Sequence, residues 1–239
     1  MPIIKIALGT VRELALAKVK AYSTPMRLYR YRPLGDKTDR EIDAILKKFI
    51  YCPKFSDMND PMEGMHRESL NYIIKGRSRN EREDIQQAKN KLGIASLSEV
   101  YDHEPMWAHY ASNFRGMCVA YTTSKLLKAF PSHFDFVRMS YNEDPPVLLA
   151  DRKTIIDKAK LTLSSKSVRW MSEREWRLIT PGYGAAHYDD IKCVFRIYLG
   201  SRVEAKIEKK VRQEMAALNI PVLKMRIDMY KIGFSRTGD

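Results

Sequence analysis

The stretch EPMWAHYASNFRGMCVAY, residues Glu104–Tyr121, is the part of the chain from which we begin to predict the fold. Gly116 divides it into two parts of different character. The run Met117–Tyr121 after the glycine is short and apolar, which is typical of a buried strand. The residues before the glycine are polar and aromatic at helical spacing, so we expect a short helix followed by a buried strand.

The polar and aromatic side chains of that helix are candidates for a binding site. Helical spacing aligns His109 with Asn113 on one face and places Trp107 and Tyr110 on a neighbouring face. A histidine and an asparagine beside two large aromatic rings suit a ligand pocket. The same residues suit a core helix whose polar tips find hydrogen-bond partners, so both interpretations stay open.

Length and composition favour a folded, cytoplasmic protein. A chain of 239 residues with 44% hydrophobic residues can bury a sizeable core, and no linker divides it. We predict a single domain over residues 25–239, after an N-terminal helical extension (1–24) that caps the domain or holds a protein partner. No apolar run approaches the ~18 residues of a membrane span, and no signal peptide is evident. Three scattered cysteines suit a reducing compartment.

The formal net charge of +13 favours a polyanion, either nucleic acid or a phosphate-bearing small molecule, as a partner. The basic residues are spread along the chain, and runs such as residues 75–91 mix them with Asp and Glu. Mixed runs are typical of solvated helix faces, so the charge alone does not identify a nucleic-acid-binding protein. We expect residues 65–92 to form one exposed, charged helix.

The segment RLYRYR, residues Arg27–Arg32, predicts an early strand that Pro33 ends. Alternation places Arg30 and Arg32 on the same side of the strand, where a guanidinium could bind a phosphate. It leaves open which of the two arginines points into a site. The commoner alternative is an exposed strand edge that charged side chains protect from further pairing.

The turn SDMNDPME, residues 56–63, is a second polar cluster. Asn59 and the neighbouring aspartates could contact a sugar or a nucleobase. Turn capping explains the sequence Asn59-Asp60-Pro61 equally well, because Asn and Asp hydrogen-bond their own backbone in turns.

The segment SEREWR, residues Ser172–Arg177, is the third polar cluster. In a strand, Glu173, Glu175 and Arg177 share one face, and Trp176 takes the other. Two carboxylates at this spacing are costly unless a cation, a metal or a substrate hydroxyl holds them, which makes them the best catalytic candidates. In the alternative, Glu175 only pairs with Arg177, Arg174 or Arg169.

Short strands interspersed with helices, without a regular βαβ alternation, indicate the α+β class. We predict a split, mixed or antiparallel sheet flanked by helices, in which residues 27–32 and 172–179 form central strands. The chain contains no GxxxxGK[ST], no GxGxxG after a strand, no HExxH and no CxxC pair. A P-loop or Rossmann nucleotide site and a local zinc site therefore have no support.

Five blocks, in order, resemble a widespread bacterial family of domains of unknown function. They are LYRYRP (28–33), FSDMNDPMEG (55–64), ASLSE (95–99), MWAHYASNFRGMCVAY (106–121) and WMSEREWRL (170–178). Members of that family share an LY[RK]Y start, an SxxNDPxE turn, a WxHY block that ends in glycine, and a terminal ExEWR strand. The resemblance covers roughly residues 28–234.

A remoter resemblance is to ADP-ribosyltransferases, especially those that modify nucleic acid bases. In these enzymes an early strand supplies a His or Arg, a middle element supplies a Ser or Tyr, and a late strand supplies the catalytic Glu. Arg30, Ser96 or Ser98, and Glu175 occur in that order. The resemblance implies an ADP-ribosyltransferase-like fold, NAD as substrate, Glu175 with Glu173 as catalytic residues, and a bacterial toxin or phage-defence setting.

The same resemblance implies how NAD is held. A carboxylate would stabilise the oxocarbenium-like ribose, Arg30 would bind the pyrophosphate, and Tyr31 or Trp107 would stack on the nicotinamide or adenine ring. The further binding candidates are Asn59, Ser96, Ser98, His109 and Tyr110. With a basic surface, nucleic acid is the natural acceptor, and a protein acceptor stays open.

Two other classes of function stay open. A metal-dependent nuclease would use Asp57, Asp60 and Glu63 together with the Glu173/Glu175 pair. A non-enzymatic nucleic-acid-binding or regulatory module would use the same carboxylates only as salt-bridge partners. Loss of activity in EDTA would identify the nuclease, and undiminished binding in a Glu173/Glu175 double variant would favour the module.

Overall fold

The computed structural model describes residues 24–74, 78–150 and 153–236. The chain divides into two compact units, and we describe each by itself. Within the described residues, the first unit contains Tyr51–Ser96 and Pro131–Ala185, and the second contains Pro25–Ile50, Leu97–Phe130 and the chain from Ala186 onward. The N-terminal helix predicted within residues 1–24 lies outside the described residues, apart from Thr24.

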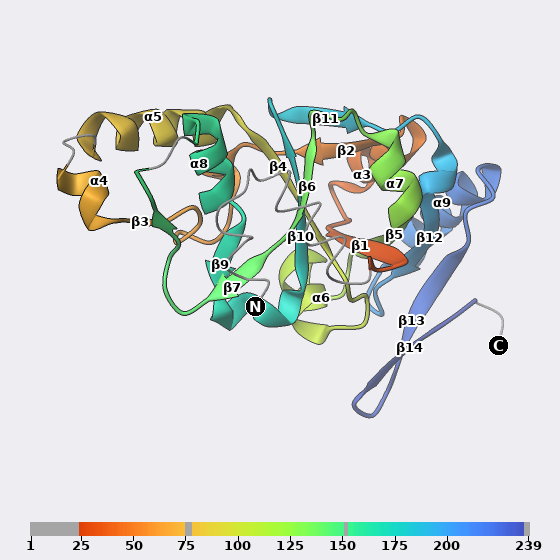
Figure 1. Ribbon diagram of the computed structural model, residues 1–239. Helices are drawn as coiled ribbons and strands as arrows, with labels where there is room; N and C mark the ends of the chain where they lie inside the picture. Colours follow the sequence, from red (N-terminus) through yellow and green to blue (C-terminus); the bar gives the residue numbers. More distant parts are fainter. Residues whose placement is uncertain (1–23, 75–77, 151–152, 237–239) are drawn as a thin grey trace. The chain divides into compact units, whose positions relative to one another are not determined.

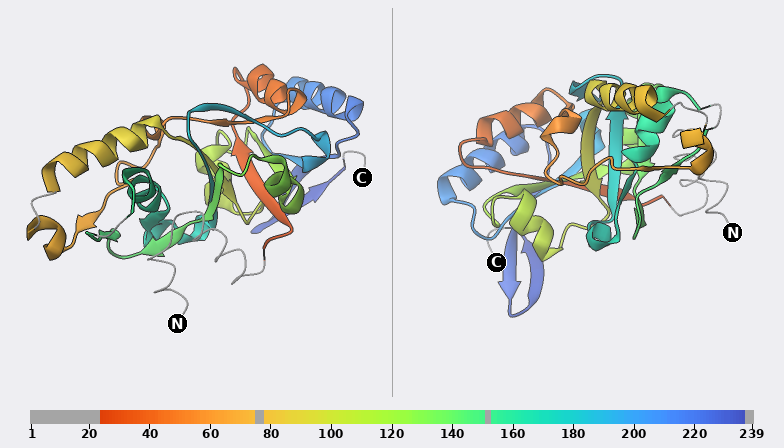
Figure 2. Two further views of the ribbon diagram at one scale, coloured as in Figure 1. Left: turned by 45° about the horizontal axis from the view of Figure 1, so that its top comes forward. Right: turned by 90° about the vertical axis from the view of Figure 1, so that its left-hand side faces the viewer.

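The second unit is built on strands that pair mainly in antiparallel fashion (Figure 1). Its strands are β1 (Arg27–Arg32), β5 (Met117–Thr122), β12 (Val194–Leu199), β13 (Val222–Asp228) and β14 (Lys231–Ser235). Its helices are α3 (Thr38–Leu46), α6 (Glu104–Tyr110), α7 (Thr123–Ala129), α9 (Ala205–Ala217) and the 3-10 turn η3 (Ile191–Cys193). Strand β5 pairs antiparallel with β1 and β12, β12 pairs parallel with β13, and β13 and β14 form a hairpin. Helices α3 and α9 lie side by side (Figure 2), and Lys210 pairs with Asp39 across them.

The stretch Glu104–Tyr121 forms the predicted helix and strand, α6 and β5. Trp107 is 0% exposed and packs in a core cluster with Tyr31 of β1, Cys118 of β5 and Tyr198 of β12. After α6 the chain turns through three consecutive non-glycine residues with positive φ, Ser112, Asn113 and Phe114. This is a costly backbone conformation that only surrounding contacts can hold.

Gly116 is required where this turn meets β1. A Cβ on Gly116 would lie 2.3 Å from the carbonyl oxygen of Arg32 and 2.8 Å from the backbone of Ala111. Both neighbours are backbone atoms that are fixed in their own elements, so neither can easily move aside. The glycine of the WxHY block therefore serves a close backbone approach.

Replacing Gly116 with alanine should lower the free energy of unfolding by about 1–3 kcal/mol, since the added methyl overpacks a rigid contact. Denaturant unfolding followed by circular dichroism measures this change. Gly233→Ala in β14 is the matched control, because a Cβ there would meet nothing within 4 Å. Equal stability of the two variants would contradict the steric explanation.

The first unit contains short strands and two longer helices. Its strands are β3 (Arg67–Glu68), β6 (Asp135–Arg138), β7 (Ser140–Asn142), β8 (Val147–Leu148), β9 (Ser165–Ser167) and β10 (Glu175–Thr180). Its helices are α4 (Leu70–Ile74), α5 (Ser78–Lys91), α8 (Ile155–Thr162) and the 3-10 turns η1 (Phe55–Asp57) and η2 (Val168–Glu173). Strands β2 (Phe49–Cys52), β4 (Gly93–Ser98) and β11 (Gly184–His187) have residues in both units. Helices α5 and α8 lie side by side (Figures 1 and 2) over a core that includes Ile85, Leu163 and Ile179.

The sequence prediction for residues 65–92 is wrong in two respects. The segment is not one helix, because Arg67 and Glu68 pair with Val147 and Leu148 as strands β3 and β8. Nor is α5 exposed throughout, since it buries Ile85 and Lys89. Tertiary pairing and packing override the local helical preference of a charged segment.

The fold class is confirmed as α+β with a mixed sheet. Eight strands form this sheet in the order β14-β13-β12-β5-β1-β4-β10-β6. The strands predicted to be central are both interior: Arg27–Arg32 is β1, and the predicted segment 172–179 contains β10, which begins only at Glu175. Within the described residues, no helix is long and apolar enough to cross a membrane.

Candidate functional site

A group of buried charged side chains in the first unit is the strongest candidate for a functional site. We call it the carboxylate cluster, and its members are Glu63, Lys166, Glu173, Glu175 and Arg177. Each of these side chains is at most 8% exposed. Three carboxylates face two cations, so the fully ionised cluster carries one formal negative charge in a buried place.

Strand β10 sets the centre of the cluster by alternation. Glu175, its first residue, and Arg177 point to the same face, while Trp176 packs on Phe136 of β6 with ring centroids 5.7 Å apart. The backbone N–H of Glu175 donates to the hydroxyl of Tyr141 at 2.7 Å. Burial of Trp176 fixes the register of β10 and therefore the direction of the Glu175 side chain.

Both carboxylate oxygens of Glu175 accept hydrogen bonds. Its Oε1 accepts from Arg177 Nε at 2.7 Å and from Ser96 Oγ at 2.6 Å. Its Oε2 accepts from Lys166 Nζ at 3.3 Å and from Arg177 Nη2 at 3.4 Å. The pairing of Glu175 with Arg177, which was the alternative in the sequence analysis, is thus present, together with two donors that it did not include.

Glu173 lies elsewhere than predicted. It is the last residue of the turn η2, and Arg174 with φ 45° separates it from β10, so Glu173 does not share a strand face with Glu175. The two carboxylates nevertheless meet at one cation, because Lys166 Nζ donates to Glu173 Oε2 at 2.8 Å. The cation that the close carboxylates were expected to need is therefore Lys166, which also lies over the ring of Trp170.

Glu63 connects the cluster to the turn predicted as the second polar segment. Its Oε1 accepts from Arg177 Nη2 at 2.6 Å and lies 3.7 Å from Lys166 Nζ. Its Oε2 is buried without a hydrogen-bond partner. Arg177 also donates to the carbonyl oxygen of Leu163 at 2.8 Å. The excess negative charge of the cluster is therefore least compensated at Glu63.

The cluster keeps Glu175 ionised. Burial alone would raise the pKa of its carboxyl, but the charges of Arg177 and Lys166 and the hydrogen bonds from Arg177 and Ser96 outweigh burial and lower the pKa to about 2. Burial would lower the pKa of Lys166, but Glu175 and Glu173 raise it instead. A carboxylate held in this way is a poor proton acceptor at neutral pH and a permanent negative charge.

Stability should therefore fall in acid through Glu175. Its ordinary pKa is 4.5 and its folded value is about 2, so its stabilising contribution is complete above pH 4.5 and is lost as the pH falls toward 2. Urea unfolding of the wild type and Glu175→Gln between pH 7 and 2 measures this contribution. The difference in unfolding free energy should shrink below pH 4.5, and a difference independent of pH would contradict the assignment.

Ser96 links this buried carboxylate to solvent. Ser96 is exposed to solvent, and its hydroxyl donates a hydrogen bond to the buried carboxylate of Glu175. Ser98, the other serine considered in the sequence analysis, is buried, and its hydroxyl accepts from the backbone N–H of Val100 at 3.0 Å. The structure thus brings Ser96 to Glu175 and gives Ser98 a local backbone contact.

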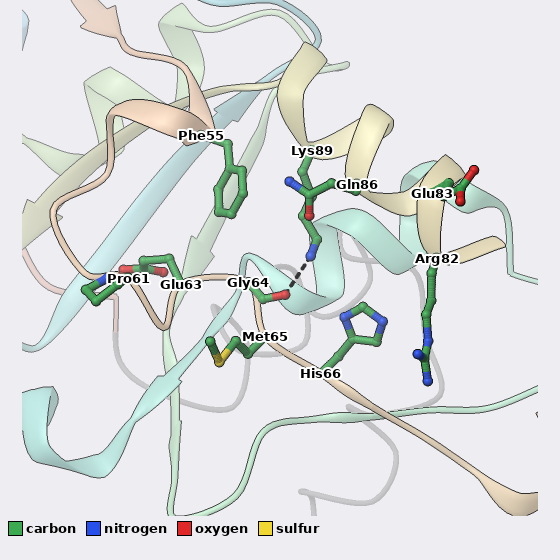
Figure 3. Close-up of a pocket in the computed structure, with 10 residues that line it drawn as sticks. All are labelled: Phe55, Pro61, Glu63, Gly64, Met65, His66, Arg82, Glu83, Gln86 and Lys89. Atoms are coloured by element: carbon green, nitrogen blue, oxygen red, sulfur yellow. Dashed lines mark hydrogen bonds between the residues drawn. The ribbon is translucent and has the colours of Figure 1, made fainter. Parts of the chain in front are cut away.

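The first unit also contains a pocket of about 650 Å³ to which Glu63 contributes (Figure 3). Helix α5 and the chain from Pro61 to His66 line it. Asn59, the predicted contact in the preceding turn, is exposed. Within the described residues, no three His, Cys, Asp or Glu side chains form a group that could hold a metal ion.

The remaining predicted residues lie in the second unit. Tyr31 is buried, donates its hydroxyl to the carbonyl oxygen of Val100 and packs edge-on against Trp107, whose indole N–H donates to Tyr101. Both rings have core environments, so the core interpretation describes them better than ring stacking on a ligand. His109 is exposed and Tyr110 half-buried, as a binding role would allow.

The two arginines of β1 differ in their environments. Arg32 donates to both carboxylate oxygens of Glu41, at 2.6 and 2.7 Å, while Arg30 is buried. Both arginines belong to the second unit and Glu175 to the first, and that these residues share one cleft stays a prediction.

Sequence reasoning did not select Lys166, Tyr141 or Lys89. Lys166 lies in a short strand between two serines, a context without a local signature. Side-chain alternation would have predicted that Lys166 points inward, but only if strand β9 itself had been predicted. Lys89 belonged to the segment interpreted as an exposed helix, although its spacing of four residues from Ile85 places both on one face.

Comparison with known families agrees with part of the resemblance described above. A family model, described as Protein of unknown function (DUF2971), matches residues 106–178. The match spans the WxHY block through the ExEWR strand, and so includes most of α6, all of β5 and most of β10. Searches of curated proteins and of solved structures gave no match.

Proposed function

We propose that the chain is an ADP-ribosyltransferase-like enzyme that cleaves the nicotinamide–ribose bond of NAD, with Glu175 as its stabilising carboxylate. The observation that carries the proposal is the 2.6 Å hydrogen bond from the exposed Ser96 to Glu175. It joins a middle serine to a late glutamate on neighbouring strands β4 and β10. These are two of the three positions that the resemblance to this enzyme class requires.

The electrostatics of the cluster suit this chemistry. Breaking the bond between ribose C1′ and nicotinamide leaves positive charge on the sugar, while nicotinamide departs with the bonding electron pair. A permanently ionised carboxylate stabilises that charge without a proton transfer. The acceptor oxygen or nitrogen then bonds to C1′ and releases its proton to water, and with water itself as acceptor the product is ADP-ribose.

The cations of the cluster orient the carboxylate. Arg177 and Lys166 hold it from two sides, and Ser96 holds it from the side nearest solvent. A ribose hydroxyl that approached past Ser96 would meet Oε1 of Glu175, the oxygen that already accepts a hydrogen bond from the Ser96 hydroxyl. In this proposal Ser96 and Arg177 are positioning residues, and Glu175 is the group that touches the substrate.

The nuclease alternative has less support. Its proposed ligands Glu63, Glu173 and Glu175 are already paired with Lys166 and Arg177, which occupy the place that a metal ion would need. A carboxylate with a pKa near 2 is also a weak general base for activating water.

Mass spectrometry of acceptors tests the proposed function. The purified protein is incubated with NAD and single- or double-stranded oligonucleotides, with and without EDTA. An ADP-ribose adduct that forms in EDTA supports a transferase, with nucleic acid as the acceptor favoured by the net charge of +13. Shortened oligonucleotides that form without EDTA and do not form in its presence would instead identify a metal-dependent nuclease.

A further inference from the structure

A buried lysine in the pocket of Figure 3 has no role in the chemistry proposed above. Lys89, on the last turns of α5, is 3% exposed. Its ammonium donates to the carbonyl oxygen of Gly64 at 2.6 Å and lies 5.6 Å from the ring centroid of Phe55 (Figure 3). These are weak compensations for a buried charge, because burying an ammonium is costly unless a carboxylate pairs with it.

The other buried lysines of the described residues are stabilised by ion pairs with glutamates. Lys158 pairs with Glu81 at 3.3 Å, and Lys166 pairs with three glutamates. Lys89 alone among these three makes no ion pair within the described chain. Burial accordingly lowers the pKa of Lys89 to about 8. A lysine that costs stability in this way is typical of a functional position.

The surroundings of Lys89 add basic groups. His66 lies beside it in the pocket, with a pKa lowered by burial and by the charge of Lys89 (Figure 3). Arg82 lies about two helical turns before Lys89 on α5 and also lines the pocket. Arg82 is bonded to both oxygens of Glu68. The two acidic residues of the lining are directed elsewhere: the carboxylate of Glu63 pairs with Arg177 in the carboxylate cluster, and Glu83 is directed away from Lys89 (Figure 3).

We infer that this pocket is a binding site for the phosphate group of a small phosphorylated ligand, with Lys89 as its principal contact. The volume of about 650 Å³ is that of a small-molecule site. A phosphate oxygen would supply the missing counter-charge to the ammonium, whose other protons stay available beside its single bond to Gly64. His66 and Gln86 would add hydrogen-bond donors, and Phe55 an apolar wall.

Calorimetric titration with inorganic pyrophosphate tests the inference at low salt. Lys89→Met keeps an unbranched side chain, shorter by one atom, and removes its charge. It should weaken pyrophosphate binding by about tenfold or more, the effect of losing one charge-assisted hydrogen bond. Lys91→Met, an exposed lysine on the same helix, lowers the net charge equally and should change the affinity less than about twofold. Equal loss in both variants, or none in Lys89→Met, would overturn the assignment.

A measurement on the unmodified protein keeps the test independent of how the variant folds. Pyrophosphate should slow backbone amide hydrogen exchange in the pocket-lining segments around Gly64 and Lys89, as read by peptide mass spectrometry, and should leave exchange in β14 unchanged. Unchanged exchange in the pocket-lining segments at saturating pyrophosphate would contradict the site. Neither readout depends on NAD turnover, so this inference and the proposed enzyme activity can fail separately.

Discussion

Replacing Glu175 with glutamine is expected to lower the rate of nicotinamide release from NAD by ~10²-fold or more, the scale of losing one preorganised electrostatic group. Glutamine keeps the volume and the reach of the side chain, removes its charge and replaces one of its two acceptor oxygens with an NH2 donor. A cationic sugar transition state would lose its stabilising carboxylate, whereas a role in substrate binding alone would chiefly raise KM. Initial rates over a range of NAD concentrations separate these two cases.

The fold should survive this substitution. Glu175 is paired with Arg177 and Lys166, so the charge is stabilising and its loss should cost about 1.5–3 kcal/mol of unfolding free energy, as for a charge-assisted hydrogen bond. A relief of repulsion from Glu173 is not expected, because Lys166 lies between the two carboxylates. A folded variant with full turnover would contradict the catalytic role, and an unfolded one would make Glu175 a structural ion-pair residue.

Replacing Arg177 with methionine should be the most destabilising single change in the cluster, at about 3–5 kcal/mol. Arg177 is 0% exposed and bonds Glu63, Glu175 and the carbonyl of Leu163. Without it, Lys166 alone would face three buried carboxylates, and these would have to take up protons or water. Guanidinium unfolding at pH 7 measures the loss.

Arg169→Met is the matched control for this prediction. Arg169 is an exposed arginine in η2, close in sequence to the same cluster, and its replacement should change stability by no more than ~0.5 kcal/mol. Similar losses in the two variants would show that Arg177 contributes through its bulk or net charge rather than through its buried pairs.

The sequence predicted the strands that centre the fold because their signals are local. Three segments combine apolar or aromatic residues with a nearby proline or glycine, and all three form strands. They are β1 (Arg27–Arg32), β5 (Met117–Thr122) and β10 (Glu175–Thr180). The prediction of one helix over residues 65–92 was wrong because part of this segment forms β3. That strand exists only through its pairing with β8, which lies far along the chain. Pairing of this kind leaves no trace in a short window.

The candidate site was predictable only in part for a similar reason. The ExE spacing identified Glu175 and Glu173 as carboxylates that need a counter-charge, which the cluster confirms. It did not identify Lys166, because nothing in the sequence around a lone lysine indicates that three carboxylates surround it in the fold. Ser96 and Ser98 lie on the same face of β4, so alternation could not choose between them. The choice depended on which serine lies opposite Glu175, which the hydrogen bond from Ser96 answers.

Release of nicotinamide from NAD by the wild-type protein tests the central claim most directly. The full chain is incubated with NAD at neutral pH in the presence of EDTA, and free nicotinamide is separated and quantified over time, with Glu175→Gln as the matched blank. The account predicts release by the wild type that continues in EDTA and falls ~10²-fold or more in the variant. Release no faster in the wild type than in the variant, with both proteins folded and with nucleic acid present as acceptor, would contradict it.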